Sequence, residues 1–156
     1  MISVGIGGFR FQLRAAAVIV DDRSVLLHRL EGDEFWALPG GRVEPGEDAR
    51  STLVRELNEE LAESVVCDDL VYVVENFFTH AGEPNHEVGL YFVTRLKPES
   101  VLLDKARSHW GAEGGHRLEF RWFVVEQLAK VDLRPSFLCQ SLSQSILQFQ
   151  HVVQRG

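Results

Sequence analysis

Past residue 47 the spacing of apolar residues changes from the alternation typical of strands to a repeat of four. Leu53, Leu57 and Leu61 follow this repeat, which places them on one stripe of a helix. We expect the helix to run from Glu47 to about Glu63 and to pack its leucine stripe against a core. Any fold of this chain must therefore provide an apolar surface for this helix.

The opposite side of the predicted helix is acidic. Glu47 and Asp48 are expected in its first turn, where the positive end of the helix dipole favours carboxylates. Glu56, Glu59 and Glu60 are three or four residues apart, so their carboxylates share the face away from the leucines. Neighbouring like charges destabilise a helix by roughly a few tenths of a kcal/mol per pair unless a cation or an arginine compensates them. Oxygen ligands at this spacing suit Mg²⁺ or Mn²⁺, whereas a solvated acidic face would explain the same residues without a metal.

Most other apolar segments are typical of strands, because they are short, rich in β-branched and aromatic residues, and bounded by turn residues. A first hairpin is expected around Asp21 and Asp22, and a second around residues 81–85. The expected strands cover residues 13–20, 25–30, 65–78, 86–96 and 119–125.

Two further helices are expected near the end of the sequence. A short one covers residues 126–130, and Pro135 opens a last helix whose apolar residues recur at helical spacing. These residues, which we expect to cover the core, are Leu138, Leu142, Ile146 and Phe149. The order of elements predicts an α/β fold in which a mixed β-sheet is sandwiched between helices.

Length and charge limit the remaining possibilities. The 156 residues are the length of one domain, which buries roughly two-thirds of the surface of its unfolded chain. The net charge of −7 disfavours binding to duplex nucleic acid or to acidic membranes. No segment approaches the roughly 18 to 20 apolar residues that span a bilayer. Because Cys67 and Cys139 predict free thiols in a reducing compartment, we expect a cytoplasmic protein with a single domain over residues 1–156.

A longer pattern contains the acidic helix and makes the metal interpretation specific. Gly41 is followed by five residues, Glu47, seven residues, and then Arg-Glu-Leu-Asn-Glu-Glu at residues 55–60. This arrangement matches GX5EX7REUXEE, in which U is a bulky aliphatic residue, and the segment 41–63 resembles the Nudix box. The segment 36–41 and the hairpins expected before and after the box resemble the rest of a Nudix domain. The resemblance implies the Nudix α/β/α fold for the whole chain.

The resemblance also implies an activity and a metal site. Similar proteins bind Mg²⁺ or Mn²⁺ through the carboxylates that match Glu56, Glu59 and Glu60, often with the backbone carbonyl that matches Gly41. They hydrolyse a small-molecule nucleoside diphosphate linked to another group, by attack of water on one phosphorus. The implied enzyme is a hydrolase that acts on diphosphate bonds.

Two residues of the box have an implied structural role, and two depart from the pattern. The residue that matches Arg55 pairs with the one that matches Glu47 and holds the loop against the helix. Ala62 stands where the box has glycine, and Glu63 where it has a bulky aliphatic residue. Because glycine lets the chain leave the helix with a positive φ, Ala62 implies that the helix continues or exits differently.

Several carboxylates are candidates for the general base that takes a proton from the attacking water. Glu59 and Glu56 lie on the acidic helix face. Glu119 and Glu113 are further candidates, because family members differ in the position of this residue. A surface role would explain either of the last two equally simply.

Aromatic and basic residues outside the box are candidates for binding the substrate. Trp36 and Phe78 are candidates for stacking on a nucleobase, and His80 for contact with phosphate. Arg29 is a further candidate for the substrate site, where its positive charge would balance the acidic residues. Core aromatic and surface polar roles would explain the same residues. The family's proline marker for ADP-sugars and tyrosine marker for dinucleoside polyphosphates are both missing, since residues 78–80 are Phe-Thr-His.

Two other functions are compatible with the same residues. One is a catalytically silent Nudix-like domain that binds a nucleotide or a partner protein. The other is a Nudix-fold isomerase that acts on a diphosphate-bearing substrate and leaves the diphosphate intact. The last predicted helix would also allow a homodimer interface.

Overall fold

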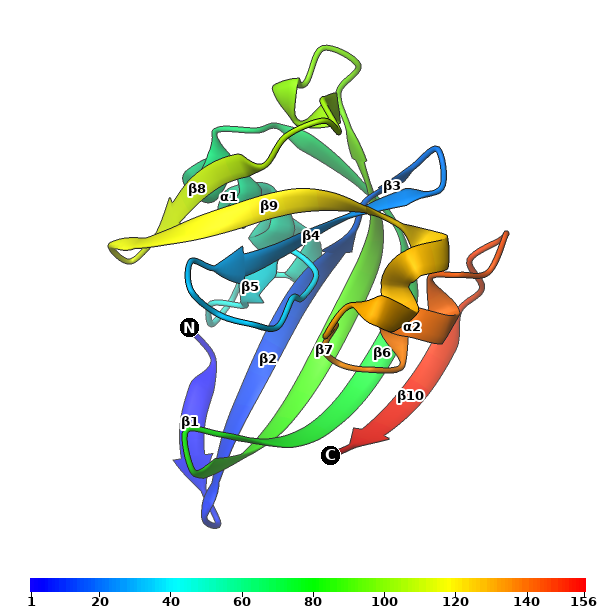
Figure 1. Cartoon of the computed structure of the whole chain (residues 1–156). Coiled ribbons are helices and arrows are strands. Elements are labelled where there is room, and N and C mark those ends of the chain that lie inside the picture. The colour runs from blue at the N-terminus through cyan, green and yellow to red at the C-terminus, as the bar shows by residue number, and fades with distance from the viewer.

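The computed structural model describes residues 1–156 and contains two β-sheets (Figure 1). The main path of the larger sheet is β1 (Ser3–Ile6), β2 (Phe9–Val18), β7 (Glu83–Leu96), β6 (Val65–His80) and β10 (Gln150–Arg155), and β5 (Gly40–Arg42) pairs with β2 beside this path. The smaller sheet contains, in order, β3 (Val20–Asp21), β4 (Ser24–Leu30), β9 (His116–Val124) and β8 (His109–Glu113).

The larger sheet is mixed. β2 pairs with β7 in parallel, as does β10 with β6, whereas β1 and β5 are antiparallel to β2, and β6 is antiparallel to β7. All pairs in the smaller sheet are antiparallel. The helical segments are α1 (Ala49–Leu61), α2 (Leu138–Ser141) and the 3-10 turns η1 (Val101–Leu103) and η2 (Val125–Lys130).

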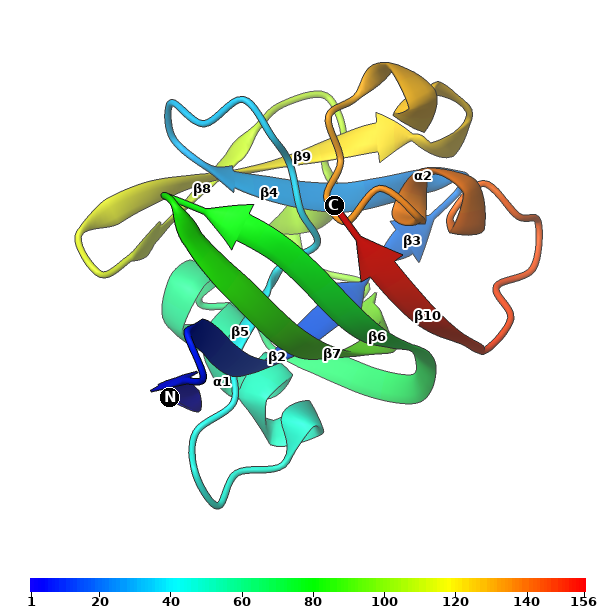
Figure 2. The ribbon, with the colours of Figure 1, turned by 90° about the horizontal axis from the view of Figure 1, so that it is seen from below.

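Two apolar cores lie on the two faces of β2. Ala15 and Ala17 belong to the core that contains Leu53 and Leu57 of α1. Ala16, which faces the other way, belongs to the core that contains residues of η2 and α2. Figures 1 and 2 show α1 and α2 on opposite sides of the molecule. The predicted α/β fold, a mixed sheet between helical elements, is therefore confirmed.

The ends of α1 differ from the predicted ones. Asp48 is the N-cap, and its carboxylate accepts a hydrogen bond from the backbone N–H of Ser51 at 2.9 Å. The prediction that Glu47 and Asp48 form part of the first turn is therefore wrong, because capping satisfies a free N–H from outside the helix. Ala62 ends the helix with φ 56° and donates its N–H to Asn58 at 2.9 Å.

The expectation that Ala62 would extend or redirect the helix is also wrong. The alanine adopts the left-handed conformation that glycine usually supplies at this position. The N–H of Glu63 then donates a hydrogen bond to the carbonyl of Leu57. This bond completes the left-handed C-terminal cap that is common at helix ends. Glu63 stands where the Nudix box has a bulky aliphatic residue. Its side chain accepts a hydrogen bond from Ser100, so a polar contact replaces an apolar one at this position.

The predicted hairpins form with different extents. The second hairpin is present as β6 and β7, whose paired residues run to His80 and Glu83 at the tip. The first one is divided, because β2 ends at Val18 and the turn joins the short β3 to β4 in the other sheet. The predicted strand 119–125 coincides with most of β9, and the helix 126–130 forms as the 3-10 turn η2.

The predicted last helix is largely wrong. Leu138 and Leu142 are buried as expected, but α2 ends at Ser141. Ile146 and Phe149 are 74% and 60% exposed, and the chain continues into β10, which pairs with β6. The free edge of β6 can satisfy backbone hydrogen bonds of the last residues, which the helical spacing of four apolar residues does not predict.

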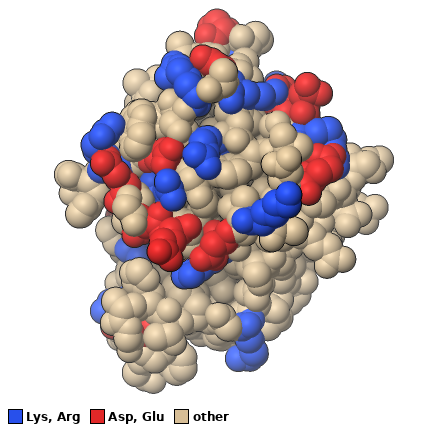
Figure 3. Space-filling model, viewed as in Figure 1, with Lys and Arg blue, Asp and Glu red and all other residues tan.

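The surface is of mixed charge on the face drawn in Figure 3. Acidic and basic side chains are interspersed over β9, β4 and β5, and the lower part of this face is mostly uncharged. None of the helices has both the length and the hydrophobicity needed to cross a bilayer.

Candidate metal centre and adjoining cavity

Three carboxylates from two elements meet beside α1. Glu56 and Glu60 belong to α1, and Glu113 is the last residue of β8. One carboxylate oxygen from each of the three lies within 4.8 Å of the others. We call these three residues the carboxylate cluster. Residues on one helix face and at one strand end are thus combined into a single group of oxygen atoms.

Glu60 is the most buried member of the cluster. The residue is 6% exposed, and neither of its carboxylate oxygens has a hydrogen-bond partner. Burial, and then the negative charges of Glu113 and Glu56, raise the pKa of Glu60 to about 9. Burial also raises the pKa of Glu56. An unpartnered buried carboxylate is costly, so this position calls for a bound cation.

Two glycines allow the backbone to approach the cluster. A Cβ atom on Gly41 would lie 2.4 Å from the carboxyl carbon of Glu56. A Cβ atom on Gly111 of β8 would lie 2.5 Å from the backbone oxygen of Glu60. Close packing against the backbone therefore requires glycine at Gly111, whereas a side chain at Gly41 would displace the carboxylate of Glu56. Gly41 brings β5 against Glu56, and Gly111 brings β8 against the end of α1.

Arg55 connects the cluster to the loop before α1. It donates hydrogen bonds to both carboxylate oxygens of Glu47, at 2.8 and 2.9 Å, and to Glu56 at 3.0 Å. These bonds from Arg55, followed by one from Thr52, lower the pKa of Glu47 to about 2. Arg55 thus carries a positive charge to one edge of the acidic site.

Glu59 lies outside the carboxylate cluster. Its side chain is 59% exposed, and its contact with Arg55 is longer, at 3.3 Å. Of the residues expected to bind metal, the structure brings Glu56, Glu60 and Gly41 together, and it adds Glu113 in place of Glu59. The site consists of carboxylate oxygens, which are hard ligands, and the carboxylate of Glu60 is buried without a hydrogen-bond partner. Such a site fits Mg²⁺ or Mn²⁺.

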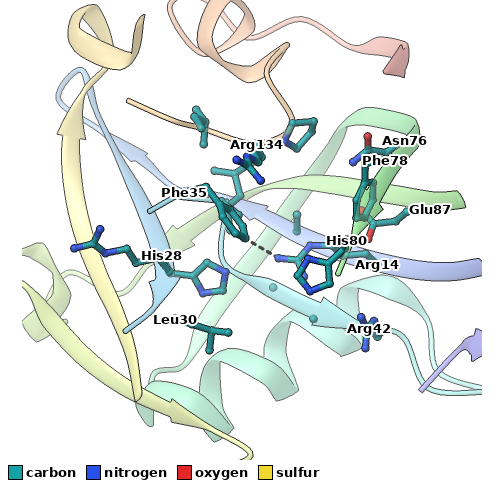
Figure 4. Close-up of a pocket in the computed structure, with 18 of the residues that line it drawn as sticks. Arg14, His28, Leu30, Phe35, Arg42, Asn76, Phe78, His80, Glu87 and Arg134 are labelled. Atoms are coloured by element: carbon teal, nitrogen blue, oxygen red, sulfur yellow. Dashed lines mark hydrogen bonds between the residues drawn. The ribbon is translucent and has the colours of Figure 1, made fainter. Parts of the chain in front are cut away.

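The cluster opens into a cavity of about 570 Å³, a volume in the range of sites for small molecules. Glu56, Glu113 and Gly41 line one part of it, and Asn76 and Glu87 line another. Figure 4 shows Asn76 and Glu87 on the opposite side of the cavity from His28 and Leu30.

Basic side chains also line the cavity. Arg14 donates a hydrogen bond to the carbonyl of Leu38 at 2.9 Å, and its end points into the cavity (Figure 4). Its positive charge lowers the pKa values of Glu60 and Tyr91, although burial dominates both. Arg42 and Arg134 also line the cavity. Cationic groups are thus available in the cavity that adjoins the carboxylate cluster.

The residues expected to bind substrate are separated by the structure. Phe78, His80 and Arg29 line the cavity. Trp36 is 4% exposed and belongs to a core instead, where the guanidinium of Arg29 lies 4.4 Å from its ring. Its neighbour Phe35 lines the cavity in its place.

Glu119 is engaged away from the cavity. Arg29 donates to one of its carboxylate oxygens at 3.0 Å, and Ser108 to the other at 2.6 Å. Burial alone would raise the pKa of Glu119, but these two hydrogen bonds and the positive charges of Arg29 and Arg121 together lower it. A carboxylate with both oxygens bonded is poorly placed to take a proton from water.

Sequence reasoning did not identify Phe35, Asn76 and Glu87. The sequence does contain a signal for Asn76 and Glu87. On β6, Asn76 shares a strand face with the buried Tyr72 and Val74, and on β7, Glu87 shares one with the buried Tyr91. Polar residues on a buried strand face mark a place where the face meets a ligand or a polar partner.

Comparisons with known proteins agree on one family. Residues 10–138 match the family described as the NUDIX domain. Nudix hydrolase 25 of Arabidopsis thaliana is 32% identical over 118 residues, which cover 76% of this chain and 57% of that protein. Nucleoside diphosphate-linked moiety X motif 6 of Mus musculus is 28% identical over 128 residues, which cover 81% of this chain and 36% of that protein. The chain spans about a third of the length of the first curated relatives that it matches.

Solved structures agree on the fold. The crystal structure of a NUDIX hydrolase from Nitrosomonas europaea has a TM-score of 0.64 with this chain at 19% identity. The similar region covers 93% of this chain and 79% of that one. At this identity the likeness concerns the arrangement of strands and helices.

Proposed function

Because the chain belongs to the Nudix hydrolase family, we propose that it is a divalent-metal-dependent pyrophosphohydrolase of a nucleoside diphosphate derivative. Water attacks one phosphorus of the diphosphate linkage, and the bond from that phosphorus to the bridging oxygen breaks. The relatives' names support this substrate class, since one of them refers to a nucleoside diphosphate linked to a moiety X.

One observation carries the proposal. The carboxylate of Glu60 is buried with neither oxygen bonded, and it lies in a cluster with Glu56 and Glu113 beside a cavity large enough for a nucleotide. A buried carboxylate without hydrogen bonds indicates that a cation binds at this site. A purely structural acidic face would leave its carboxylates in water.

Each part of the site has a role in the proposed reaction. Glu56, Glu60 and Glu113 would hold Mg²⁺ or Mn²⁺, which supplies charge neutralisation on the phosphate oxygens and a more acidic water. Arg14 and Arg42 line the cavity and would orient the diphosphate through charge-assisted hydrogen bonds. Arg55 and Glu47 hold the loop before α1 in place.

Glu59 is the candidate that we retain for the general base. Its carboxylate is exposed and is not part of the cluster, and only one of its oxygens is bonded, by Arg55 at 3.3 Å, so the other oxygen can take a proton. Glu119 is the weaker candidate because both its oxygens are bonded.

The proposal is tested by measuring phosphate and nucleotide release from nucleoside triphosphates, sugar nucleotides and dinucleoside polyphosphates with Mg²⁺ or Mn²⁺. Wild type should turn over at least one of these compounds, chelation of the metal should abolish turnover, and Glu60→Gln should lower kcat by at least about 100-fold. Glu59→Ala should lower kcat by about 100-fold or more if Glu59 is the base.

Glu63→Gln is the matched control, because this residue lies near α1 but is bonded to Ser100. It should keep wild-type turnover. Absence of turnover on every compound, with nucleotide binding retained, would contradict the proposal and favour a silent binding domain. A product that keeps its diphosphate would favour an isomerase.

A further inference from the structure

A row of polar side chains crosses four neighbouring strands at the end of the cavity. Gln12 of β2 pairs in register with Glu87 of β7, Glu87 with Asn76 of β6, and Asn76 with Gln154 of β10. Gln12, Glu87 and Asn76 are 3%, 7% and 8% exposed. Asn76, Glu87 and Gln154 line the cavity. We call these four residues the polar row.

The hydrogen bonds within the protein leave part of the polar row free. Gln12 donates to the Oε2 atom of Glu87 at 2.7 Å, and Gln154 accepts a hydrogen bond from the backbone N–H of Phe137 at 3.1 Å. The Oε1 atom of Glu87 and the amide of Asn76 are not bonded by protein groups. Because Glu87 and Asn76 line the cavity, these free atoms are open to a ligand, whereas the unbonded Oε1 atom of Gln12 is buried.

The groups around the free atoms fit a flat molecule. Phe78, two residues after Asn76 on β6, and Phe35, from the segment between β4 and β5, both line the cavity. In the view of Figure 4 the end of Arg14 lies between these two rings, and Asn76 and Glu87 lie next to Phe78. The guanidinium of Arg134 lies 4.5 Å from the ring of Phe35. Aromatic faces suit a planar ring, and the carboxylate and amide suit its polar edge.

We propose that Glu87 and Asn76 bind the hydrogen-bonding edge of the nucleobase and make the protein selective for guanine. This inference rests on the proposed function, because that function places the diphosphate of the same substrate near the carboxylate cluster. The base then lies at the polar row, and Arg14 lies on the path between the two.

The selectivity follows from a count of donors and acceptors. A carboxylate only accepts hydrogen bonds, and Glu87 retains a free oxygen while Gln12 fixes its orientation. Guanine presents two adjacent donors, N1–H and the 2-amino group, which suit one carboxylate in a paired arrangement. The Watson–Crick edges of adenine and cytosine place a ring acceptor next to the amino donor, and uracil has one N–H between two carbonyl oxygens. Each of these bases would direct at least one acceptor at a carboxylate.

Glu87→Gln is the decisive variant because it keeps the size of the side chain and the acceptor for Gln12. The new amide offers one acceptor and one donor, which matches the edge of adenine. For wild type we expect kcat/KM for GTP to exceed that for ATP, CTP and UTP by about 10-fold or more. For Glu87→Gln we expect the GTP value to fall by roughly 10- to 100-fold and the preference for GTP over ATP to disappear.

Glu75→Gln is the matched control. Glu75 is the neighbour of Asn76 on β6, but its side chain bonds to His151 and does not line the cavity. The variant removes the same charge from the opposite face of the same sheet. Its preference for GTP should equal that of wild type, and thermal unfolding should show that both variants are folded.

A binding measurement separates this inference from the proposed function. Calorimetric titration of the metal-free protein with GMP, AMP, CMP and UMP needs no turnover. Tighter binding of GMP that is lost in Glu87→Gln supports the inference even if no compound is hydrolysed. Equal binding of the four monophosphates, or a preference that survives in Glu87→Gln, would overturn it even if the protein proves to be a pyrophosphohydrolase.

Discussion

Ala62 combines a left-handed backbone with a side chain that disfavours it. Its φ and ψ are 56° and 32°, and its N–H closes the last turn of α1. The Cβ atom makes this conformation less favourable than it is for glycine, by roughly 1–2 kcal/mol. A glycine would lose part of this advantage, because its unfolded state is more flexible than that of alanine.

Ala62→Gly should therefore stabilise the protein. We expect a gain of about 1 kcal/mol in the free energy of unfolding, measured by urea denaturation. Ala49→Gly, at the first residue of α1, is the control of opposite sign, because the helical backbone there favours alanine. A loss of stability in Ala62→Gly would show that the left-handed turn is not under strain.

The contact between β8 and α1 decides where Glu113 lies. β8 is held in the smaller sheet by β9, and the lack of a side chain at Gly111 lets it approach Glu60 and Phe120. Glu113 follows two residues later on the same strand and reaches the carboxylate cluster. The third carboxylate is thus positioned by a strand–helix contact.

Gly111→Val should separate these elements. A side chain there would overlap the backbone oxygen of Glu60, so the concentration of Mg²⁺ needed for half-maximal activity should rise by roughly 10-fold or more. Ala112→Val, at an exposed position of the same strand, should leave the Mg²⁺ requirement unchanged. Equal effects of the two variants would argue against this contact as the positioning device.

The sequence predicts those elements whose residues are close along the chain. The leucine repeat and the carboxylates of α1 follow from spacing alone, because a helix brings residues three and four apart together. The sequence did not predict β10, because its partner strand β6 lies far away along the chain: Gln150 pairs with Tyr72, and His151 with Val73. The same reason applies to the site, since Glu113, Arg14 and Glu87 reach the cavity only through strand pairing that the sequence does not specify.

The stability of the fold as a whole should depend on pH through His28. This residue of β4 is 8% exposed, its Nδ1 atom has no partner, and burial, followed by the charge of Arg14, lowers its pKa from 6.5 to about 3. Between these two values the unfolded chain binds a proton that the folded protein does not. His28 therefore has no effect above pH 6.5 and destabilises the fold as the pH falls from 6.5 towards 3.

His28→Phe should weaken this dependence. Between pH 7 and pH 5 wild type should lose about 2 kcal/mol more in its free energy of unfolding than the variant does. The phenyl ring suits the site because His28 already packs beside the ring of Phe120, with centroids 5.3 Å apart. Urea denaturation of both proteins at the two pH values measures the difference, and parallel losses would contradict a buried neutral histidine.

The carboxylate cluster and the polar row are supplied by different parts of the fold. α1, β5 and β8 surround the cluster, whereas β6, β7 and β10 carry most of the row. Mutation can therefore alter one without rebuilding the other. A lineage of such proteins can acquire a new substrate by changing two or three side chains on the sheet while its chemistry stays constant, and an engineer can follow the same route.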